Sequence, residues 1–485
     1  MAAIEPDNAT GSSGGSSGAG HHDRVKLPEP AAGPVLESTP GAVQRYPEVK
    51  SGDLHHIVIV GGGAGGLVLA TKLGHTLGRR RKARITLIDA SLTHIWKPLL
   101  HEVAVGTMDS HKDDVIYLGH AKAHHFSFQQ GRMDGLDRSR HEIILAPVLD
   151  PEGREVIRRR TIRYDTLVIA VGGICNDFGT PGVQEHCMFL DTHLQAEQVQ
   201  RRLLNACLRA QTQEGPLTEG QLNIAIIGAG ATGVELAAEL HRAMREMVAY
   251  GLDRIDPERD VKISLIEAGP VVLPALPPRL SEATMAELRR LGVRIHTGER
   301  VVEVTEKGVH TQSGLFIPAE LKVWSAGVKA PDFLREIDGL ETNRLNQLVV
   351  GETLVTTRDN DIFALGDCVS CPQPGSDRPV PPRAQAAYQE AQTLAKTLRR
   401  HLQGQPPRPF VYKDYGSLVS LSYSSVGNLM GNLLGSVMIE GKLARLTYLS
   451  LYKKHQLALH GLVWVALVSL INLIRLRTEP RLKLH

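Results

Sequence analysis

Unbroken runs of branched apolar residues recur along this chain, and several of them end in glycines. Residues 57–60 are Ile-Val-Ile-Val and are followed at once by Gly61; residues 224–227 repeat the pattern before Gly228. An apolar run without alternation is typical of a parallel strand covered on both faces. Two further strand-like segments, residues 164–171 and 321–324, extend the series. The pattern predicts an α/β fold with parallel sheets.

The glycines that follow the two main runs share the spacing G-x-G-x-x-G. In this motif the first glycine allows a tight turn, the second lets backbone approach a pyrophosphate, and the third lets a helix pack on the strand. The helix, expected to begin near Ala64 in the first copy, points its unpaired N–H groups at the phosphates. The glycines concerned are Gly61, Gly63 and Gly66 in the first copy, and Gly228, Gly230 and Gly233 in the second.

Each copy has a carboxylate at the end of its next strand, where it can hold a ribose hydroxyl pair. Asp89 closes residues 84–88 and Glu267 closes residues 262–266. Two complete units imply two dinucleotides, which suggests a flavin adenine dinucleotide facing a nicotinamide. Glu267 would repel a 2′-phosphate, and no arginine follows it directly, so NADH is expected rather than NADPH.

Five further positions are candidates for chemistry. Asp367, after Gly366 at the end of residues 361–365, is placed to hold a flavin ribityl chain, or to cap a helix. Lys97 can reach the diphosphate or the cofactor ring, or be solvated. Gly327 ends residues 321–327, which we assign to the nicotinamide unit. Gln385 and Gln389 share one helix face, which by itself proves little.

Composition and net charge limit the number of domains and the classes of protein, but they identify no catalytic residue. The chain has 485 residues, 42% of them hydrophobic, which suits two or three domains. A net charge of +3 gives no reason to expect nucleic acid, and five scattered cysteines suit a reducing cytoplasm. Residues 1–53 are rich in Gly, Ser, Ala and Pro and are expected to be disordered, with no secretory signal. His21 and His22 are too weak a feature to predict a metal site.

Beyond residue 411 the chain changes character. Residues 415–441 suggest a small antiparallel hairpin, and 443–454 have helical spacing. Residues 457–474 are almost continuously apolar between basic groups, at the border of the roughly 20 residues that a spanning helix needs. We expect a helix pair lying in the membrane interface. A buried helix or a homodimer contact is the alternative.

Four segments together resemble the type II (non-proton-pumping) NADH:quinone oxidoreductases, which are two-dinucleotide-binding flavoproteins. They are residues 96–104, 176–183, 233–237 and 384–389, and the resemblance runs from about residue 54 to the C-terminus. It implies two Rossmann-like domains of the glutathione-reductase type plus a C-terminal membrane-associating helical region. It also implies non-covalent FAD in the first glycine unit, NADH in the second, and a membrane quinone.

Carried over residue by residue, the resemblance assigns further roles. Gln385 and Gln389 would line a quinone tunnel beside the flavin ring, with Gln385 also contacting FAD. Glu235 would lie near flavin and nicotinamide, although pairing with its helix dipole is an alternative. The expected parts are a tail (1–53), an FAD-binding domain in two pieces (54–188 and 330–410), an NADH-binding domain (189–329) and a membrane-association region (411–485).

The implied function is a respiratory NADH dehydrogenase that passes hydride from NADH to FAD and two electrons to a membrane quinone. Its expected place is peripheral, on the cytoplasmic side of a bacterial inner membrane, or at a mitochondrial inner membrane. Cys368 and Cys371 form a C-x-x-C that departs from this pattern, and with Cys175 they leave a sulfide:quinone oxidoreductase or a dithiol enzyme open. An NADH-sensing flavoprotein that signals through a partner is the non-enzymatic alternative.

Overall fold

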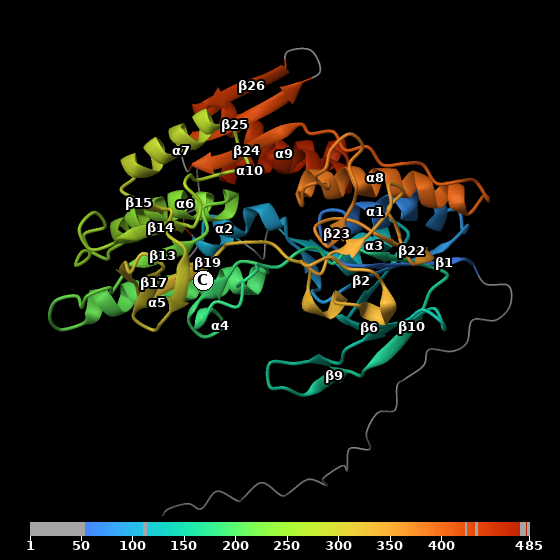
Figure 1. The fold of residues 1–485 in the computed structure, drawn as a ribbon, viewed down its shortest axis with the longest axis horizontal. Coiled ribbons are helices and arrows are strands. Elements are labelled where there is room, and N and C mark those ends of the chain that lie inside the picture. The colour runs from blue at the N-terminus through green and yellow to red at the C-terminus, as the bar shows by residue number, and fades with distance from the viewer. Residues whose placement is uncertain (1–53, 110–113, 422–423, 432–434, 476–481, 483–485) are drawn as a thin grey trace, which may run out of the picture. The chain divides into compact units, whose positions relative to one another are not determined.

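The computed structural model describes residues 54–109, 114–421, 424–431, 435–475 and 482 (Figure 1). The tail expected over residues 1–53 lies outside these residues.

A six-stranded sheet, here called the first sheet, is built around β1. Its strand order is β21-β22-β11-β1-β2-β5, and every pair is parallel except β21 with β22. All five residues of β1 are buried, as expected for a central strand of a parallel sheet. The bounds are β1 His56–Val60, β2 Arg84–Asp89, β5 Ser127–Gln130, β11 Thr166–Ile169, β21 Val355–Thr356 and β22 Asp359–Ala364.

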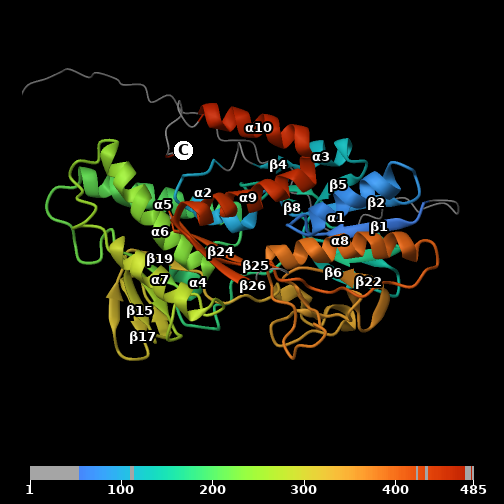
Figure 2. The same ribbon diagram turned by 90° about the horizontal axis from the view of Figure 1, so that it is seen from above.

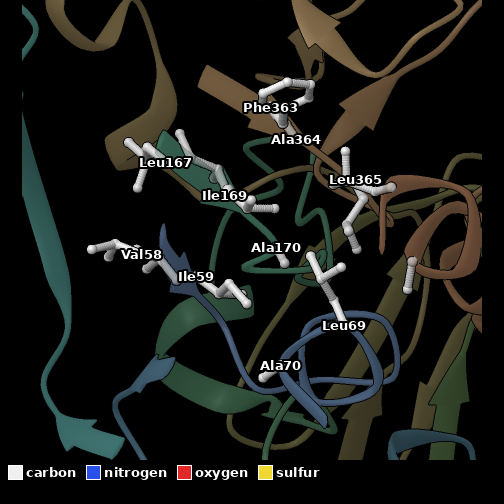
Figure 3. Close-up of a cluster of buried hydrophobic side chains, with 14 of the residues drawn as sticks. Val58, Ile59, Leu69, Ala70, Leu167, Ile169, Ala170, Phe363, Ala364 and Leu365 are labelled. Carbon is white, nitrogen blue, oxygen red and sulfur yellow. The ribbon is translucent and has the colours of Figure 1, made fainter. Parts of the chain in front are cut away.

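Helices α1 (Gly66–Leu73) and α8 (Ala384–His401) lie side by side over this sheet (Figure 1). The helix expected near Ala64 thus begins at Gly66. Figure 3 shows part of the core, where buried apolar side chains of β1, β11 and β22 gather with those of α1. The labelled members are Val58, Ile59, Leu69, Ala70, Leu167, Ile169, Ala170, Phe363, Ala364 and Leu365.

A second, five-stranded parallel sheet has the order β12-β19-β13-β14-β15. Its strands are β12 Met188–Phe189, β13 Ile224–Ile227, β14 Ile263–Glu267, β15 Arg294–Thr297 and β19 Leu321–Trp324. The associated helices are α4 Val183–His186, α5 His193–Thr212, α6 Ala231–Ala249 and α7 Pro278–Arg290. Because β21, β22 and α8 follow β19 in the chain, the first sheet is completed only after the second. The expected domain boundaries stay a prediction.

Shorter elements decorate both sheets. Between β1 and β11 in the chain they are η1 Gly74–Gly78, β3 Thr93–His94, η2 Lys97–Leu99, α2 Leu100–Ala104, β4 Val115–Ile116, α3 Tyr117–Ala123, β6 Met133–Asp137, β7 Glu142–Leu145, β8 Val148–Leu149, β9 Glu155–Ile157 and β10 Arg160–Arg163. The others are β16 Val301–Val304, β17 Gly308–Thr311, β18 Phe316–Pro318, η3 Asp332–Leu334, η4 Ile337–Gly339, β20 Leu348–Val349 and β23 Val369–Ser370.

The C-terminal part is a three-stranded antiparallel sheet followed by two helices. The strands β24 (Gly416–Leu421), β25 (Ser424–Gly431) and β26 (Gly435–Glu440) replace the hairpin that was expected, and β24 packs against α6 and α7 (Figure 1). Helices α9 (Gly441–His460) and α10 (Leu462–Arg475) are separated at Gly461, whose φ of +80° ends the first helix. None of the described helices has both the length and the apolar character needed to cross a membrane.

Candidate functional site

The first glycine loop is shaped by contacts that only glycine permits. Gly61 has φ +104° at the end of β1 and donates its N–H to Ile88 O at 2.7 Å. A Cβ on Gly66 would lie 1.8 Å from Gly61 O, so α1 can approach the strand only without a side chain there. A Cβ on Gly63, by contrast, would meet no protein atom within 4 Å. Packing within the protein therefore does not require glycine at 63, which fits a backbone that a pyrophosphate approaches.

Asp89 is held by the same loop. Its Oδ2 accepts the N–H of Gly62 at 2.6 Å, and its Oδ1 accepts the N–H of Ser91 at 2.8 Å. Burial raises the pKa of this carboxyl, while those two N–H donors act in the opposite direction. The hydroxyl of Tyr117 donates to Gly62 O at 2.8 Å and fixes the outer side of the turn.

The second glycine loop repeats this arrangement at the level of atoms. Gly228 has φ +102° and donates its N–H to Ile266 O at 2.8 Å, and a Cβ on Gly233 would lie 2.0 Å from Gly228 O. Glu267 accepts the N–H of Ala229 at Oε2 and that of Gly269 at Oε1, both at 2.8 Å. Gly230, like Gly63, leaves its Cβ position free of protein atoms within 4 Å. The chain therefore carries two equivalent dinucleotide cradles.

Lys97 and Asp367 lie together at the glycine-rich end of β11. Lys97 Nζ donates to Gly173 O at 2.8 Å and approaches Asp191 Oδ1 at 3.3 Å. Burial raises the pKa of Asp367, and the Lys97 cation works against that rise. Gly366, with φ +83°, sets the turn between β22 and Asp367. Lys97 is thus fixed by two protein partners rather than freely solvated, although its side chain stays 47% exposed.

Glu235, on α6, is buried where three segments meet. Its Oε1 accepts the N–H of Ser420 of β24 at 2.9 Å, and its Oε2 lies 3.5 Å from Nδ1 of His101 on α2. Burial lowers the pKa of His101 to about 4, so the imidazole is neutral at pH 7. Sequence reasoning missed His101 as an individual residue. Its only signal was its place inside the family-like segment 96–104.

Gln385 and Gln389 use their shared face of α8 to hold residues 413–416, which lead into β24. The amide of Gln385 donates to Gly416 O at 3.0 Å. Gln389 donates to Lys413 O at 2.8 Å and accepts the Lys413 N–H at 3.1 Å. These two side chains are therefore structural contacts between α8 and the C-terminal sheet, not merely a solvated pair.

Glu390, next to Gln389, is a residue that sequence reasoning overlooked. It is 1% exposed, and its Oε2 accepts the N–H of Gly366 at 2.6 Å. Burial, above all, raises its pKa to about 7, and neighbouring Asp367 adds to the rise. Helical spacing offered a signal, because Ala387, Ala391 and Leu394 bury the same face.

Gly327 follows β19 with φ +69°, and a Cβ there would lie 2.6 Å from the ring of Phe178. The Trp324 indole N–H donates to Asn176 O at 2.9 Å. The family-like segment 176–183 is thus seated on the end of the second sheet.

The C-x-x-C cysteines are buried thiols. All five cysteines of the chain are free, and burial raises the pKa of Cys175, Cys368 and Cys371 to about 12 each. Cys368 donates to Leu365 O at 3.3 Å within the core of the first sheet. Because the thiolate is the reactive form, these positions are poorly suited to thiol chemistry.

Comparison with known proteins agrees with this geometry. A model of the pyridine nucleotide-disulphide oxidoreductase family matches residues 55–391. The type II NADH:quinone oxidoreductase of Haemophilus influenzae is 43% identical over 447 residues, which cover 89% of this chain and 100% of that protein. Among solved structures, NDH2 from Plasmodium falciparum in complex with NADH has a TM-score of 0.74, with 20% identity over 88% of this chain and 100% of that one.

The sulfide:quinone oxidoreductase of Aquifex aeolicus is a more distant structural neighbour. Its TM-score is 0.65 and its identity 17%, over 84% of this chain and 92% of that one. At this identity the likeness extends to the fold only.

Fold and site together define a two-dinucleotide-binding flavin oxidoreductase. Within that class, the chain belongs to the type II NADH:quinone oxidoreductase family. The expected fold class, enzyme class, FAD and NADH cofactors and NADH dehydrogenase function are confirmed, ahead of the sulfide:quinone alternative. The individual roles expected for site residues stay predictions.

Proposed function

We propose that this chain binds NADH at the second glycine loop, passes its hydride to FAD and delivers two electrons from FAD to a membrane quinone, without moving protons across the membrane. The observation that carries the proposal is the repeated cradle, in which Asp89 and Glu267 accept equivalent backbone N–H groups. Two cradles of the same build suit two dinucleotides, one resident and one exchanging.

In this proposal the first cradle holds FAD and the second holds NADH. The FAD-binding residues are Gly61, Gly63, Gly66, Asp89, Lys97, Gly366, Asp367 and Gln385, and the NADH-binding residues are Gly228, Gly230, Gly233, Glu267 and Gly327. FAD supplies a centre that accepts a hydride and releases two electrons. The protein contributes binding, orientation and electrostatics.

The work of the side chains follows from their placement. The N–H groups at the start of α6 would hold a pyrophosphate, and the remaining acceptor positions of the Glu267 carboxylate would accept ribose hydroxyls. Lys97, fixed by Gly173 O and Asp191, places a cation beside Asp367 and steadies negative charge at the flavin. Glu235, held by Ser420 and next to neutral His101, sets the electrostatics between the two cradles.

Quinone reduction is assigned to the seam between α8 and β24. Gln385 and Gln389 offer amide donors there, and both now bond to residues 413–416. A quinone carbonyl that enters this seam would take the place of a backbone acceptor. Loosening of residues 413–416 is then part of substrate entry.

The C-terminal helices are assigned to the lipid surface. α10 leaves Leu462, Val463, Leu467 and Leu470 between 57% and 74% exposed, and it begins beside α3, as Figure 2 shows, where Ile116 and Leu118 are 59% exposed. A contiguous exposed apolar surface of this kind marks an interaction site. The electron donor, NADH, is soluble in water, whereas the acceptor quinone lies in the membrane. Peripheral attachment, at the cytoplasmic face of a bacterial inner membrane or at a mitochondrial inner membrane, suits this pair of substrates. A homodimer contact would cover the same residues.

The test is anaerobic. NADH added to the purified yellow protein should bleach the flavin, and a quinone added afterwards should restore its absorbance. Bleaching that quinone fails to reverse would contradict the quinone step and favour an NADH sensor. Flavin reduction by sulfide, but not by NADH, would contradict the proposal as a whole.

A further inference from the structure

Four histidines meet where α9 packs against the part of the chain around the first sheet. We call His94, His120, His455 and His460 the histidine seam. His94 lies in β3 and His120 in α3, whereas His455 and His460 both come from α9. The first three are only 4–5% exposed.

The rings contact one another in pairs across the joint. Nε2 of His94 and Nε2 of His455 share a hydrogen bond at 3.0 Å, and the rings of His120 and His460 pack edge to face with centroids 5.6 Å apart. Two indoles close the ends: Trp96 lies 4.0 Å from the His455 ring, and Trp464 of α10 stacks at 4.0 Å on His460. Each α9 histidine therefore has one histidine and one tryptophan as ring partners.

Among the described residues around the seam, no charged group raises the pKa of a seam histidine. The titratable groups that influence the seam are other histidines, His75 from η1 and His124 beyond α3, and no carboxylate among the described residues raises the pKa of any seam member. Two neighbours from α1 and α3 are uncharged. The hydroxyl oxygen of Thr71 lies 2.8 Å from His120 Nε2, and the ring of Tyr117 lies near the ring of His94. Lys453, on α9, bonds to Gln456. Within the described part of the chain, no group of His, Cys, Asp and Glu is arranged to hold a metal ion.

All four histidines are consequently neutral at pH 7. Burial, joined by repulsion from the neighbouring rings, lowers the pKa of His94 to about 4, of His120 to about 3 and of His455 to about 2. Burial also lowers the pKa of His460.

We propose that the histidine seam is an acid-sensitive latch that seats α9 on β3 and α3 while its rings are neutral and releases the helix when they gain protons. When α9 lifts away, the rings enter water and regain their ordinary affinity for protons. Stability of the seated state is therefore complete above the ordinary histidine pKa of about 6.5 and falls as pH drops below it. Each histidine makes the released state roughly tenfold more populated for each pH unit below that value.

Release of α9 would affect the segment assigned to FAD as well as the exposed face of α10. Trp96, which packs on His455, directly precedes Lys97, and Lys97 is fixed to Gly173 O beside Asp367. Trp464 connects the same joint to the exposed face of α10. The seam thus links the segment assigned to membrane contact with the segment assigned to FAD. That consequence rests on the proposed function, whereas the latch itself does not.

Hydrogen exchange on the full-length, flavin-loaded protein tests the latch. Amide exchange of α9, corrected for the intrinsic effect of pH, is compared between about pH 7.5 and about pH 5.5, with α6 as an internal reference. Over this interval His94, His120 and His455 each contribute roughly tenfold, so the rise in α9 should be at least about 10³-fold in the unmodified protein. Residual opening by other routes would lower the size of the rise but not its order among variants.

Histidine variants should reduce the rise in α9 exchange according to how many titrating rings they remove. His94→Gln with His455→Gln keeps polar side chains but removes two titrating groups, and should make the rise about 100-fold smaller. His120→Gln alone should make the rise about tenfold smaller, which keeps the test decisive if the double variant fails to fold. His310→Gln, on β17 away from the seam, should behave as the unmodified protein does. An unmodified α9 that responds no more than α6, or a response undiminished in the seam variants, would overturn the latch. NADH reduction of the flavin, measured separately, reports on the proposed function.

Discussion

Ala229 donates its backbone N–H to Glu267 Oε2 at 2.8 Å, which leaves the Glu267 carboxylate fixed at the rim of the second dinucleotide cradle. A negative charge held there accepts unmodified ribose hydroxyls and repels a 2′-phosphate.

Glu267→Gln should therefore narrow the preference for NADH over NADPH. We expect roughly a tenfold loss of kcat/KM with NADH, because a hydrogen bond to a charged group is replaced by a neutral one. NADPH should gain or stay unchanged. Glu258→Gln, on the exposed surface of the same unit, is the matched control. Equal kcat/KM for both donors in the unmodified protein would contradict the assignment.

The cysteine pair should be dispensable for turnover. Cys368→Ser with Cys371→Ser puts hydroxyls into a buried site and should lower the free energy of unfolding by about 1–3 kcal/mol. NADH:quinone activity should largely remain, and sulfide should not reduce the flavin before or after the change. Cys207→Ser, another buried cysteine far from the first sheet, controls for the cost of a buried hydroxyl. Rapid reduction by sulfide would restore the dithiol alternative.

Gln385→Ala should separate the two half-reactions. Loss of the bond to Gly416 O frees residues 413–416 and removes an amide from the proposed quinone seam. NADH reduction of the flavin should change little, whereas reoxidation by quinone should slow by roughly tenfold or more. Stopped-flow absorbance measures both steps in one preparation. If both slow equally, the contact of Gln385 with FAD, and not its place at the quinone step, accounts for its effect.

Membrane binding should depend on the exposed face of α10. Leu467→Glu with Leu470→Glu puts charges at positions that are 57% and 59% exposed, so folding should be little affected. Sedimentation with anionic vesicles should fall sharply, since interfacial binding scales with buried apolar area. Leu208→Glu, an exposed leucine of α5, should still sediment. Retained sedimentation with altered oligomeric state would point to the homodimer contact.

Glu390 should impose its own pH dependence on stability. Its folded-state pKa, about 7, lies above the value of 4.5 for an unburied glutamate, so the folded state binds the proton more tightly. This contribution to stability is complete below the unfolded value and is lost as pH rises through about 7, by roughly 3 kcal/mol. Glu390→Gln keeps an acceptor for the Gly366 N–H and should remove that loss.

Urea unfolding of the unmodified protein and of Glu390→Gln, each at about pH 5 and about pH 8, gives the change in unfolding free energy with pH for both. Subtracting one change from the other cancels the contributions of the other titrating groups. Glu282 is exposed on α7, so the Glu282→Gln variant should show the same change in unfolding free energy between the two pH values as the unmodified protein. An unchanged pH dependence in Glu390→Gln would mean that the buried carboxyl is already ionised throughout.

Local order in the chain was sufficient to predict both dinucleotide units. Strand, glycine spacing and terminal acid lie within residues 57–89 in the first unit and 224–267 in the second, so the tight turns at Gly61 and Gly228 and the carboxylates Asp89 and Glu267 follow from short-range geometry. The two-stranded hairpin predicted for residues 415–441 was wrong, because the structure has a three-stranded sheet there. Glycine-rich segments carry little information about strand register, so the sequence did not reveal the middle strand.

The sequence by itself determined the two cradles, their order and, through its family-like segments, the class of enzyme. Only the tertiary structure decided which distant residues meet. Ser420 reaches Glu235, Gly366 reaches Glu390, and His455 reaches His94, across separations of 185, 24 and 361 residues. No periodicity encodes such pairs, because they arise when separately formed layers pack and each buried polar group must find a partner. The same packing turned scattered histidines into a seam.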